Sequence, residues 1–181
     1  DEINPIISCP ENQNVSFDED CAFTLVDYTS LAIATDNCLI PTILQSPAPG
    51  TIIFSTTTIM LTATDTAGNV ATCSFDVIPV DDTPPTISCP ADITVNNDPG
   101  ICGGTVTYAT PIGEDNCSAT TIITDGFVTG SIFPIGLTLV NYRVNDEIGL
   151  TATCSFNVTV IDNEIPELDC PPSISIENDP T

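Results

Sequence analysis

The sequence has almost no positive charge. Its 181 residues include a single basic side chain, Arg143, and no lysine or histidine, against 25 aspartates and glutamates. Nucleic-acid binding needs Lys and Arg to neutralise phosphates, and anionic membrane surfaces attract basic segments in the same way. The composition therefore excludes nucleic acid as a partner. Because no apolar stretch is long enough to cross a bilayer, we also expect no membrane insertion.

The missing residue types also argue against catalysis. Without His or Lys, the chain lacks the usual general bases that work near neutral pH. Paired carboxylates alone can hydrolyse glycosides, but the absence of Trp leaves no obvious aromatic platform for a sugar. We therefore expect that the chain is not an enzyme.

The chain has nine cysteines, but neither a C-x-x-C pair nor a histidine accompanies them. This excludes zinc sites and thioredoxin-like redox sites. Oxidised cystines are typical of extracellular proteins, so we expect a secreted or cell-surface location. No signal-peptide pattern is present, and we expect a mature or excised segment.

Apolar and β-branched residues are what the chain has in quantity. Apolar residues make up 41% of it and are spread evenly, which is enough to form a core despite the acid content. Val, Ile and Thr fit the pleated surface of a sheet and lose freedom in a helix. The composition therefore predicts an all-β protein.

Internal repeats organise the chain. Three short motifs recur about 80 residues apart, the period of one small module. They are Ile7-Ser8-Cys9-Pro10 with Ile87-Ser88-Cys89-Pro90 and Leu168-Asp169-Cys170-Pro171; Asp36-Asn37-Cys38 with Asp115-Asn116-Cys117; and Ala71-Thr72-Cys73-Ser74-Phe75 with Ala152-Thr153-Cys154-Ser155-Phe156. The sequence predicts two complete modules, 1–80 and 81–161, and the incomplete start of a third at 162–181.

Acidic residues and prolines mark the module boundaries, at 81–85 and 162–166. Because proline fixes φ and keeps the preceding residue extended, these junctions are expected to be short and semi-rigid, with the modules end to end. Within a module, segments 58–64 and 70–80 alternate apolar and polar residues around the turn 65–69, as the strands of a hairpin do. Seven or so short strands per module predict an immunoglobulin-like sandwich.

These motifs resemble the HYR (hyalin repeat) module, with its D-x-x-P-P-x-I-x-C-P opening, central D-N-C and A-T-x-C-S-F close. The resemblance covers both modules and the 162–181 segment. It implies immunoglobulin-like extracellular modules, usually in tandem in large adhesive or matrix proteins and in long bacterial surface proteins. The second module departs from the pattern in its last turn, where Asn145-Asp146-Glu147-Ile148-Gly149 replaces the D-x-x-G-N of the first.

Four cysteines per module allow three connectivities, and the sequence alone does not choose among them. The resemblance implies one, because related vertebrate modules beside sushi repeats keep only the first and last cysteine. It pairs Cys9 with Cys73 and Cys89 with Cys154, which leaves Cys21 with Cys38 and Cys102 with Cys117. The partner of Cys170 is then expected downstream of Thr181, the alternative being an intermolecular bond.

The carboxylates have two interpretations. Calcium takes carboxylate and backbone oxygens without nitrogen or sulfur ligands, and in an immunoglobulin-like sandwich the chain enters at the pole that carries the B–C and F–G loops. The aspartates expected there are Asp81, Asp82, Asp115 and Asp146 in the second module, and Asp1, Asp36 and Asp65 in the first. The turn Asp18-Glu19-Asp20 would face the junction from the other side. In the alternative interpretation these are solvated turn residues, because Asp favours turns.

One further motif concerns modification. Asp65-Thr66-Ala67 matches an O-glycosylation pattern used by some bacteria and falls on an expected exposed turn. Thr66 is therefore the candidate glycosylation site, and an ordinary hairpin turn is the alternative.

Two functions remain. In the first, the chain is a structural repeat of a secreted or cell-surface adhesive stalk or filament, in which each module contacts its neighbours. In the second, it is a calcium-dependent module that recognises a glycan or protein partner. Segments 39–55 and 118–133 lack the clustered aromatic and Arg residues of binding hot spots, which favours the first. Expected partners are neighbouring modules of the same protein, with lateral self-assembly or a surface glycan as further ones.

Overall fold

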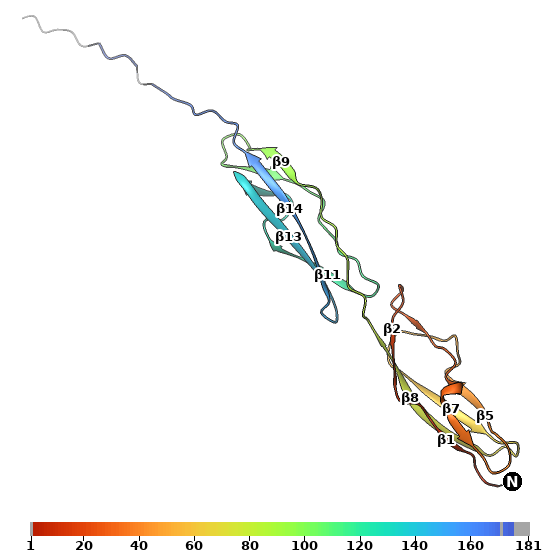
Figure 1. Cartoon of the computed structure of the whole chain (residues 1–181). Helices are drawn as coiled ribbons and strands as arrows, with labels where there is room; N and C mark the ends of the chain where they lie inside the picture. Colours follow the sequence, from red (N-terminus) through yellow and green to blue (C-terminus); the bar gives the residue numbers. More distant parts are fainter. Residues whose placement is uncertain (1, 171, 176–181) are drawn as a thin grey trace, which may run out of the picture. The chain divides into compact units, whose positions relative to one another are not determined.

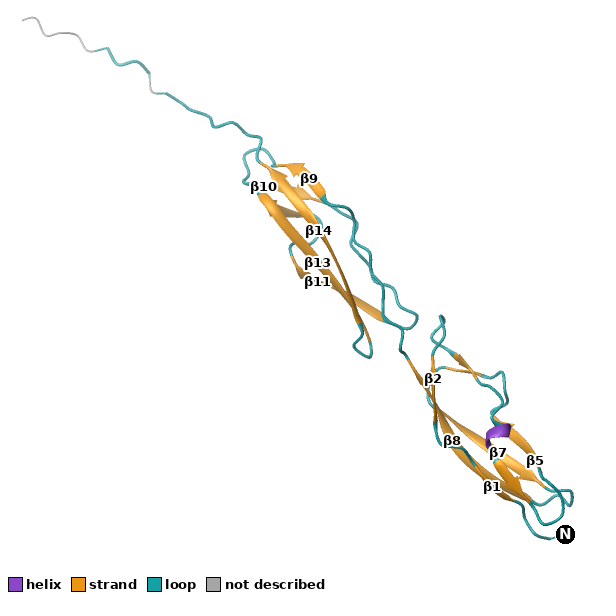
Figure 2. Cartoon of the chain, viewed as in Figure 1, coloured by secondary structure: helices purple, strands orange, loops and turns teal. Residues whose placement is uncertain are grey.

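The strands follow the same plan in each repeat. A computed structural model describes residues 2–170 and 172–175. Figures 1 and 2 show the course of the chain, which is built almost entirely of strands and loops. This confirms the predicted all-β, immunoglobulin-like sandwich. The residues group into two compact units, Asp1–Ser88 with Ile112–Ile122 and Arg143–Thr153, and Cys89–Pro111 with Ile123–Tyr142 and Cys154–Thr181.

The first repeat forms one large sheet and two small ones. Its strands are β1 (Ile6–Ser8), β2 (Gln13–Ser16), β3 (Phe23–Thr24), β4 (Ile33–Thr35), β5 (Thr42–Ser46), β6 (Ile52–Ile53), β7 (Thr57–Thr64) and β8 (Val70–Val80). The large sheet has the order β2-β8-β7-β5, and β1-β4 and β3-β6 form the small ones. A short 3₁₀ turn, η1 (Thr29–Leu31), lies between β3 and β4.

The hairpin of β7 and β8 confirms the predicted pair of strands at the end of the repeat. The two strands are antiparallel from the Thr57 and Val77 pair to the Thr64 and Val70 pair. Strand β2 runs parallel to β8 on its other side, and Ser16 pairs with Val80 at the end of the strands. The opening of the repeat is thereby paired with its last strand.

Period-two alternation places the core of the first repeat. Ile59 and Leu61 of β7 and Phe75 of β8 are buried, and they belong to one cluster with Leu25 and Tyr28, which lie between β3 and η1. The ring of Tyr28 meets that of Phe75 edge-on with centroids 5.4 Å apart, a favoured aromatic geometry. Successive side chains of a strand point to opposite faces, so the alternation read from the sequence identifies these inward positions.

The second repeat reuses this plan. Its strands are β9 (Ile93–Asn96), β10 (Gly103–Val106), β11 (Ala119–Asp125), β12 (Ser131–Pro134), β13 (Gly136–Asp146) and β14 (Thr151–Ile161), in sheets ordered β11-β13-β14-β9 and β10-β12. Phe156 is buried on β14, as Phe75 is on β8. Tyr108 packs edge-on against Phe156 at 4.9 Å. Its burial and its hydrogen bond with Tyr142 raise the pKa of Tyr108.

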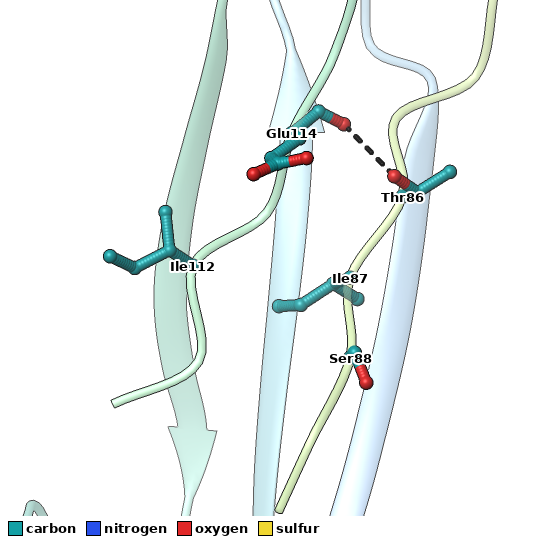
Figure 3. A pocket seen from close by; sticks show the side chains of 5 residues that line it. All are labelled: Thr86, Ile87, Ser88, Ile112 and Glu114. Carbon is teal, nitrogen blue, oxygen red and sulfur yellow. Dashed lines mark hydrogen bonds between the residues drawn. The ribbon is translucent and has the colours of Figure 1, made fainter. Parts of the chain in front are cut away.

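One edge of the second repeat has fewer paired backbone residues than the same edge of the first repeat. Where β1 pairs with β4 in the first repeat, the second has a single bridge between Thr86 and Glu114. Each backbone N–H of this pair donates to the carbonyl of the other at 2.8 Å. Figure 3 shows these two residues beside Ile87, Ser88 and Ile112, with the hydrogen bond from the Thr86 hydroxyl to the Glu114 carbonyl dashed.

The turn between β7 and β8 is held by Asp65. Its Oδ1 accepts hydrogen bonds from the backbone N–H groups of Ala67 and Asn69, and its Oδ2 accepts one from the Asn69 side chain. Burial raises the pKa of Asp65, but hydrogen bonds from Asn69, Ala67 and Gly68 outweigh that effect and hold the pKa below its ordinary value. The charged form of Asp65 therefore stabilises the turn.

Phe75→Ala should destabilise the first repeat by about 3 to 5 kcal/mol, because it removes a buried ring and leaves a cavity. Urea unfolding followed by circular dichroism measures the loss. Phe54→Ala is the matched control, since Phe54 is 69% exposed and its removal should cost far less. Equal losses for the two variants would contradict the register of β8.

Asp65→Asn should lower the melting temperature at pH 7. A carboxylate whose pKa is depressed by folding stabilises the protein above its unfolded pKa of about 3.9 and loses that contribution as the pH falls through its folded pKa. The difference in melting temperature between the variant and the original chain should therefore become smaller in acid. Glu11→Gln, the same acid-to-amide change at an exposed position, is the control. A deficit that stays constant from pH 7 to pH 2 would contradict the role of the charge.

Candidate joint between the repeats

The first compact unit contains a disulfide that joins the two repeats. Cys21 is bonded to Cys117, 96 positions away in the sequence, with their Cα atoms 4.6 Å apart. Both residues belong to the first unit, which combines the first repeat with segments of the second. By the chain-entropy estimate, closing a loop of this length stabilises the fold by about 4 to 5 kcal/mol.

Cys21 lies in the tight turn that follows β2. The Asp18 carboxylate accepts hydrogen bonds from the N–H groups of Asp20 and Ala22, each at 3.0 Å, and the Asp18 carbonyl accepts one from Cys21 at 3.2 Å. The backbone φ of Cys21 is +53°, a region that non-glycine residues seldom adopt. The turn thus presents Cys21 in a conformation that its neighbours hold in place.

Cys117 lies in the Asp-Asn-Cys turn that precedes β11. The Asp115 carboxylate accepts a hydrogen bond from the Cys117 N–H at 3.2 Å. Asn116 donates from its side chain to the Asp18 carbonyl at 3.0 Å. One covalent bond and one hydrogen bond therefore connect these two turns.

This bridge corrects part of the expected cysteine pairing. Cys21 was expected to pair with Cys38, and Cys102 with Cys117, but the structure leaves Cys38 and Cys102 as free thiols. Cys21 and Cys38 do not pair because the turns that contain them lie at opposite ends of the first repeat. Cys21 follows the end of β2 beside Val80, whereas Cys38 follows β4, whose Thr35 pairs with Ile6. A disulfide needs Cα atoms within about 7 Å, which this arrangement does not allow.

The other two bridges are those that the resemblance implied. Cys9 is bonded to Cys73 and Cys89 to Cys154, with Cα distances of 5.7 and 5.6 Å. Each ties the opening of a repeat to its last strand across 64 or 65 positions. The chain-entropy estimate for each is about 4 kcal/mol.

A cavity lies beside the bridge in the first unit. Cys21 and Cys117 line it together with apolar side chains, among them Phe17, Phe54 and Ile148. Phe54 and Ile148 remain 69% and 56% exposed. The joint therefore has an apolar surface that the two repeats share, in addition to its polar turns.

The predicted calcium ligands mostly serve turns. Asp146 accepts hydrogen bonds from Gly149 and Leu150, Asp81 from Thr83, Asp36 from Cys38, and Asp82 from the Ser16 hydroxyl. Asp1 lies outside the described residues. Between residues 2 and 170 and between 172 and 175, no group of three or more acidic, Cys or His side chains is arranged to hold a metal ion.

Some oxygens at these turns have no hydrogen-bond partner. They are Oδ1 of Asp36, Oδ1 of Asp115, Oδ1 of Asn116 and Oδ2 of Asp146, all buried. A buried acceptor without a partner costs free energy. These atoms are therefore the places where a further donor or a cation would be accommodated. Thr66, the candidate for modification, lies exposed in the turn after β7.

Sequence reasoning missed Asn116 and the Cys21–Cys117 bond. One partial signal was that the turn 18–20 and the Asp115-Asn116-Cys117 turn were both expected at the junction. The sequence did not show which cysteines meet there. The described residues contain no helix long and apolar enough to cross a membrane.

Two hyalins are similar in sequence to most of this chain. Hyalin of Strongylocentrotus purpuratus is 33% identical over 168 residues, which are 88% of this chain and 13% of that protein. Hyalin of Lytechinus variegatus is 31% identical over 74% of the chain and 25% of that protein. The chain thus spans a quarter or less of these relatives. Protocadherin Gamma B2 extracellular cadherin domains 3-6 aligns with 88% of the chain and 53% of that structure, at 13% identity and a TM-score of 0.41.

The family model described as HYR domain matches residues 1–78 and 80–160. These two matches contain both cysteine-bridged sandwiches and the two turns of the joint. The chain therefore belongs to the HYR domain family.

Proposed function

We propose that the chain is a disulfide-stabilised structural repeat of a secreted or cell-surface adhesive stalk or filament, without enzymatic activity. The observation that supports this most directly is the set of three bridges, one of which connects successive repeats. Disulfides form and persist in oxidising compartments outside the cytosol. An extracellular location fits this chemistry.

The bridges suit a part that carries load along the chain. When the ends of a repeat are pulled, the Cys9–Cys73 bond keeps the residues between its two cysteines out of the loaded path. The Cys89–Cys154 bond does the same in the second repeat. The Cys21–Cys117 bond gives the repeats a second covalent connection beside the 81–85 segment. The end-to-end length of the chain is thereby preserved even when the strands of a sandwich separate.

Pulling on the two ends of the oxidised chain should therefore produce little extension. After the bridges are reduced, each repeat should unfold and release up to roughly 220 Å, because each loop spans 64 or 65 positions and an extended residue spans about 3.3 to 3.6 Å. Single-molecule force spectroscopy measures the steps. The double variant Cys21→Ser with Cys117→Ser, which keeps the bridges within the repeats, should resist extension as the oxidised chain does. Full-length steps from the oxidised chain would contradict the proposed role.

A second candidate function is calcium-dependent binding of a glycan or protein partner. It is supported by the buried, unpartnered Oδ1 of Asp115, Oδ1 of Asn116 and Oδ2 of Asp146. Oxygen atoms of this kind, with backbone carbonyls, are the ligands that calcium prefers. A bound cation would also offset the repulsion between the carboxylates of a chain whose net charge is −24.

Titration of the metal-free chain with calcium should show saturable binding, and the melting temperature should rise because a ligand of the folded state stabilises it. Asp146→Asn should weaken both effects, since the amide does not carry the charge that attracts the cation. Asp125→Asn, at an exposed position, should leave them unchanged. Calorimetry and thermal unfolding with calcium or with chelator measure them. No heat of binding and an unchanged melting temperature would exclude this candidate.

A further inference from the structure

Two exposed thiols, one in each repeat, are equivalent to cysteines that form a disulfide elsewhere in the chain. Cys38 and Cys102 are free and exposed. Counted along the repeat, Cys38 corresponds to Cys117 and Cys102 corresponds to Cys21. Those two counterparts are bonded to each other. Cys38 and Cys102 are therefore each equivalent to one of the two cysteines that form the Cys21–Cys117 joint.

The turn of Cys38 has the same local structure as the turn of Cys117. The Cys38 N–H donates to the Asp36 carboxylate at 3.2 Å, the same distance as between Cys117 and Asp115. In each turn the Asn side chain lies against the neighbouring sulfur, at 3.4 Å from Cys38 and 3.7 Å from Cys117. The unbridged turn thus keeps the same two hydrogen bonds as the bridged one.

The turn of Cys102 shares backbone hydrogen bonds with the turn of Cys21, but the positive φ found at Cys21 (+53°) is found at Gly100 (+72°) in the second turn. Asp18 donates its N–H to the carbonyl of Ala22 at 2.8 Å, and Asp98 donates to Gly103 at 2.7 Å. The preceding residues also match, since the N–H of Phe17 donates to Val80 and that of Asn97 to Ile161.

The second turn is one residue longer, Asp98-Pro99-Gly100-Ile101-Cys102 against Asp18-Glu19-Asp20-Cys21. In both turns the Asp carbonyl accepts a backbone N–H, from Cys21 at 3.2 Å and from Ile101 at 3.0 Å. The Asp18 carbonyl is also the atom that receives Asn116. The Asp98 carbonyl is the corresponding acceptor, and the Asn97 side-chain amide, which donates to it at 3.4 Å, occupies the place that Asn116 takes at Asp18.

We propose that the turn of Cys102 is the docking surface for the Asp-Asn-Cys turn of a following HYR repeat, and that the turn of Cys38 docks in the same way on a preceding one. At each junction the Asp-Asn-Cys turn supplies a sulfur and a side-chain amide, and the turn after the second strand supplies a sulfur and a carbonyl. In a tandem array, each repeat then has one disulfide within it and a further disulfide to the next repeat. This inference rests on the proposed structural role.

Each new bridge requires an oxidant, for which we name a small-molecule disulfide such as oxidised glutathione. One cysteine thiolate attacks this disulfide, forms a mixed disulfide and releases one glutathione thiolate. The second cysteine thiolate then attacks the protein sulfur of the mixed disulfide and releases the other glutathione. Two protein thiols are oxidised to one cystine, and one glutathione disulfide is reduced to two thiols. The two protons leave with the glutathione.

The test is a chain in which residues 1–161 are followed directly by a second copy of residues 81–161. The added copy carries Ser118→Thr, an exposed change that marks its Asp-Asn-Cys peptide by mass. After oxidation in a glutathione buffer, free thiols are alkylated and non-reduced peptides are identified by mass spectrometry. One Cys102 per molecule should be bonded to the marked Cys117, and the Cys102 of the added copy should be alkylated.

A matched variant has Cys117→Ser in the added copy, which should leave both Cys102 residues alkylated. The proposal is overturned if both are alkylated in the chain that keeps the marked Cys117. It is also overturned if Cys102 is bonded to the Cys117 of its own repeat. The bridges Cys9–Cys73 and Cys89–Cys154 report separately on the proposed structural role, because their loss would count against that role.

A second measurement does not depend on the extended chain. Cys38→Ser and Cys102→Ser variants of the 181-residue chain, each with Cys170→Ser, keep one of the two thiols apiece. Mixed under the same oxidation, they should form a heterodimer linked through Cys38 and Cys102, at least tenfold in excess of the homodimers that each forms alone. Equal yields of homodimer and heterodimer would show unselective oxidation and overturn the proposed docking.

Discussion

The covalent cross-link is the constraint on which this structure depends. A module of about 80 residues has little interior, and the core cluster of the first repeat consists of seven buried side chains. Small cores of this kind supply only a few kcal/mol of net stability, and the chain also carries a net charge of −24, which opposes compaction. A bridge worth about 4 kcal/mol by chain entropy is comparable with the whole stability of such a module.

The position of the bridges matters as much as their number. Cys9–Cys73 and Cys89–Cys154 connect the opening of each repeat to its last strand, where β2 and β9 also pair in parallel with β8 and β14. The beginning and end of each sandwich are thereby closed twice, by hydrogen bonds and by a covalent bond. The Cys21–Cys117 bond applies the same device between two repeats.

The abundant aspartates stabilise individual turns in addition to contributing to the net charge. Asp18, Asp65 and Asp115 each accept backbone N–H groups of their own turn, as short polar side chains do in turns. Two of these turns then carry the cysteines of the joint. The same residue type therefore shapes the turns, keeps the surface acidic, and leaves a few buried oxygens available to a further partner.

The sequence by itself determined the sheet fold, the 80-residue period and the inward positions. Alternation identified the β7–β8 hairpin, and because residues two apart on a strand face the same way, it also accounts for the inward position of Phe75 on β8. These features are local or periodic, so a single chain reveals them. The pairing of Cys9 with Cys73 came from the family resemblance rather than from spacing.

Only the tertiary structure decided the partner of Cys21. In a periodic sequence, a bond from Cys21 to Cys38 and a bond from Cys21 to Cys117 are equally compatible with the spacing, because Cys38 and Cys117 are equivalent residues one repeat apart. What separates them is the end of the sandwich at which each turn lies. That depends on the path of β2 and β4 through the fold, since a disulfide forms only between residues that folding brings within a few ångströms.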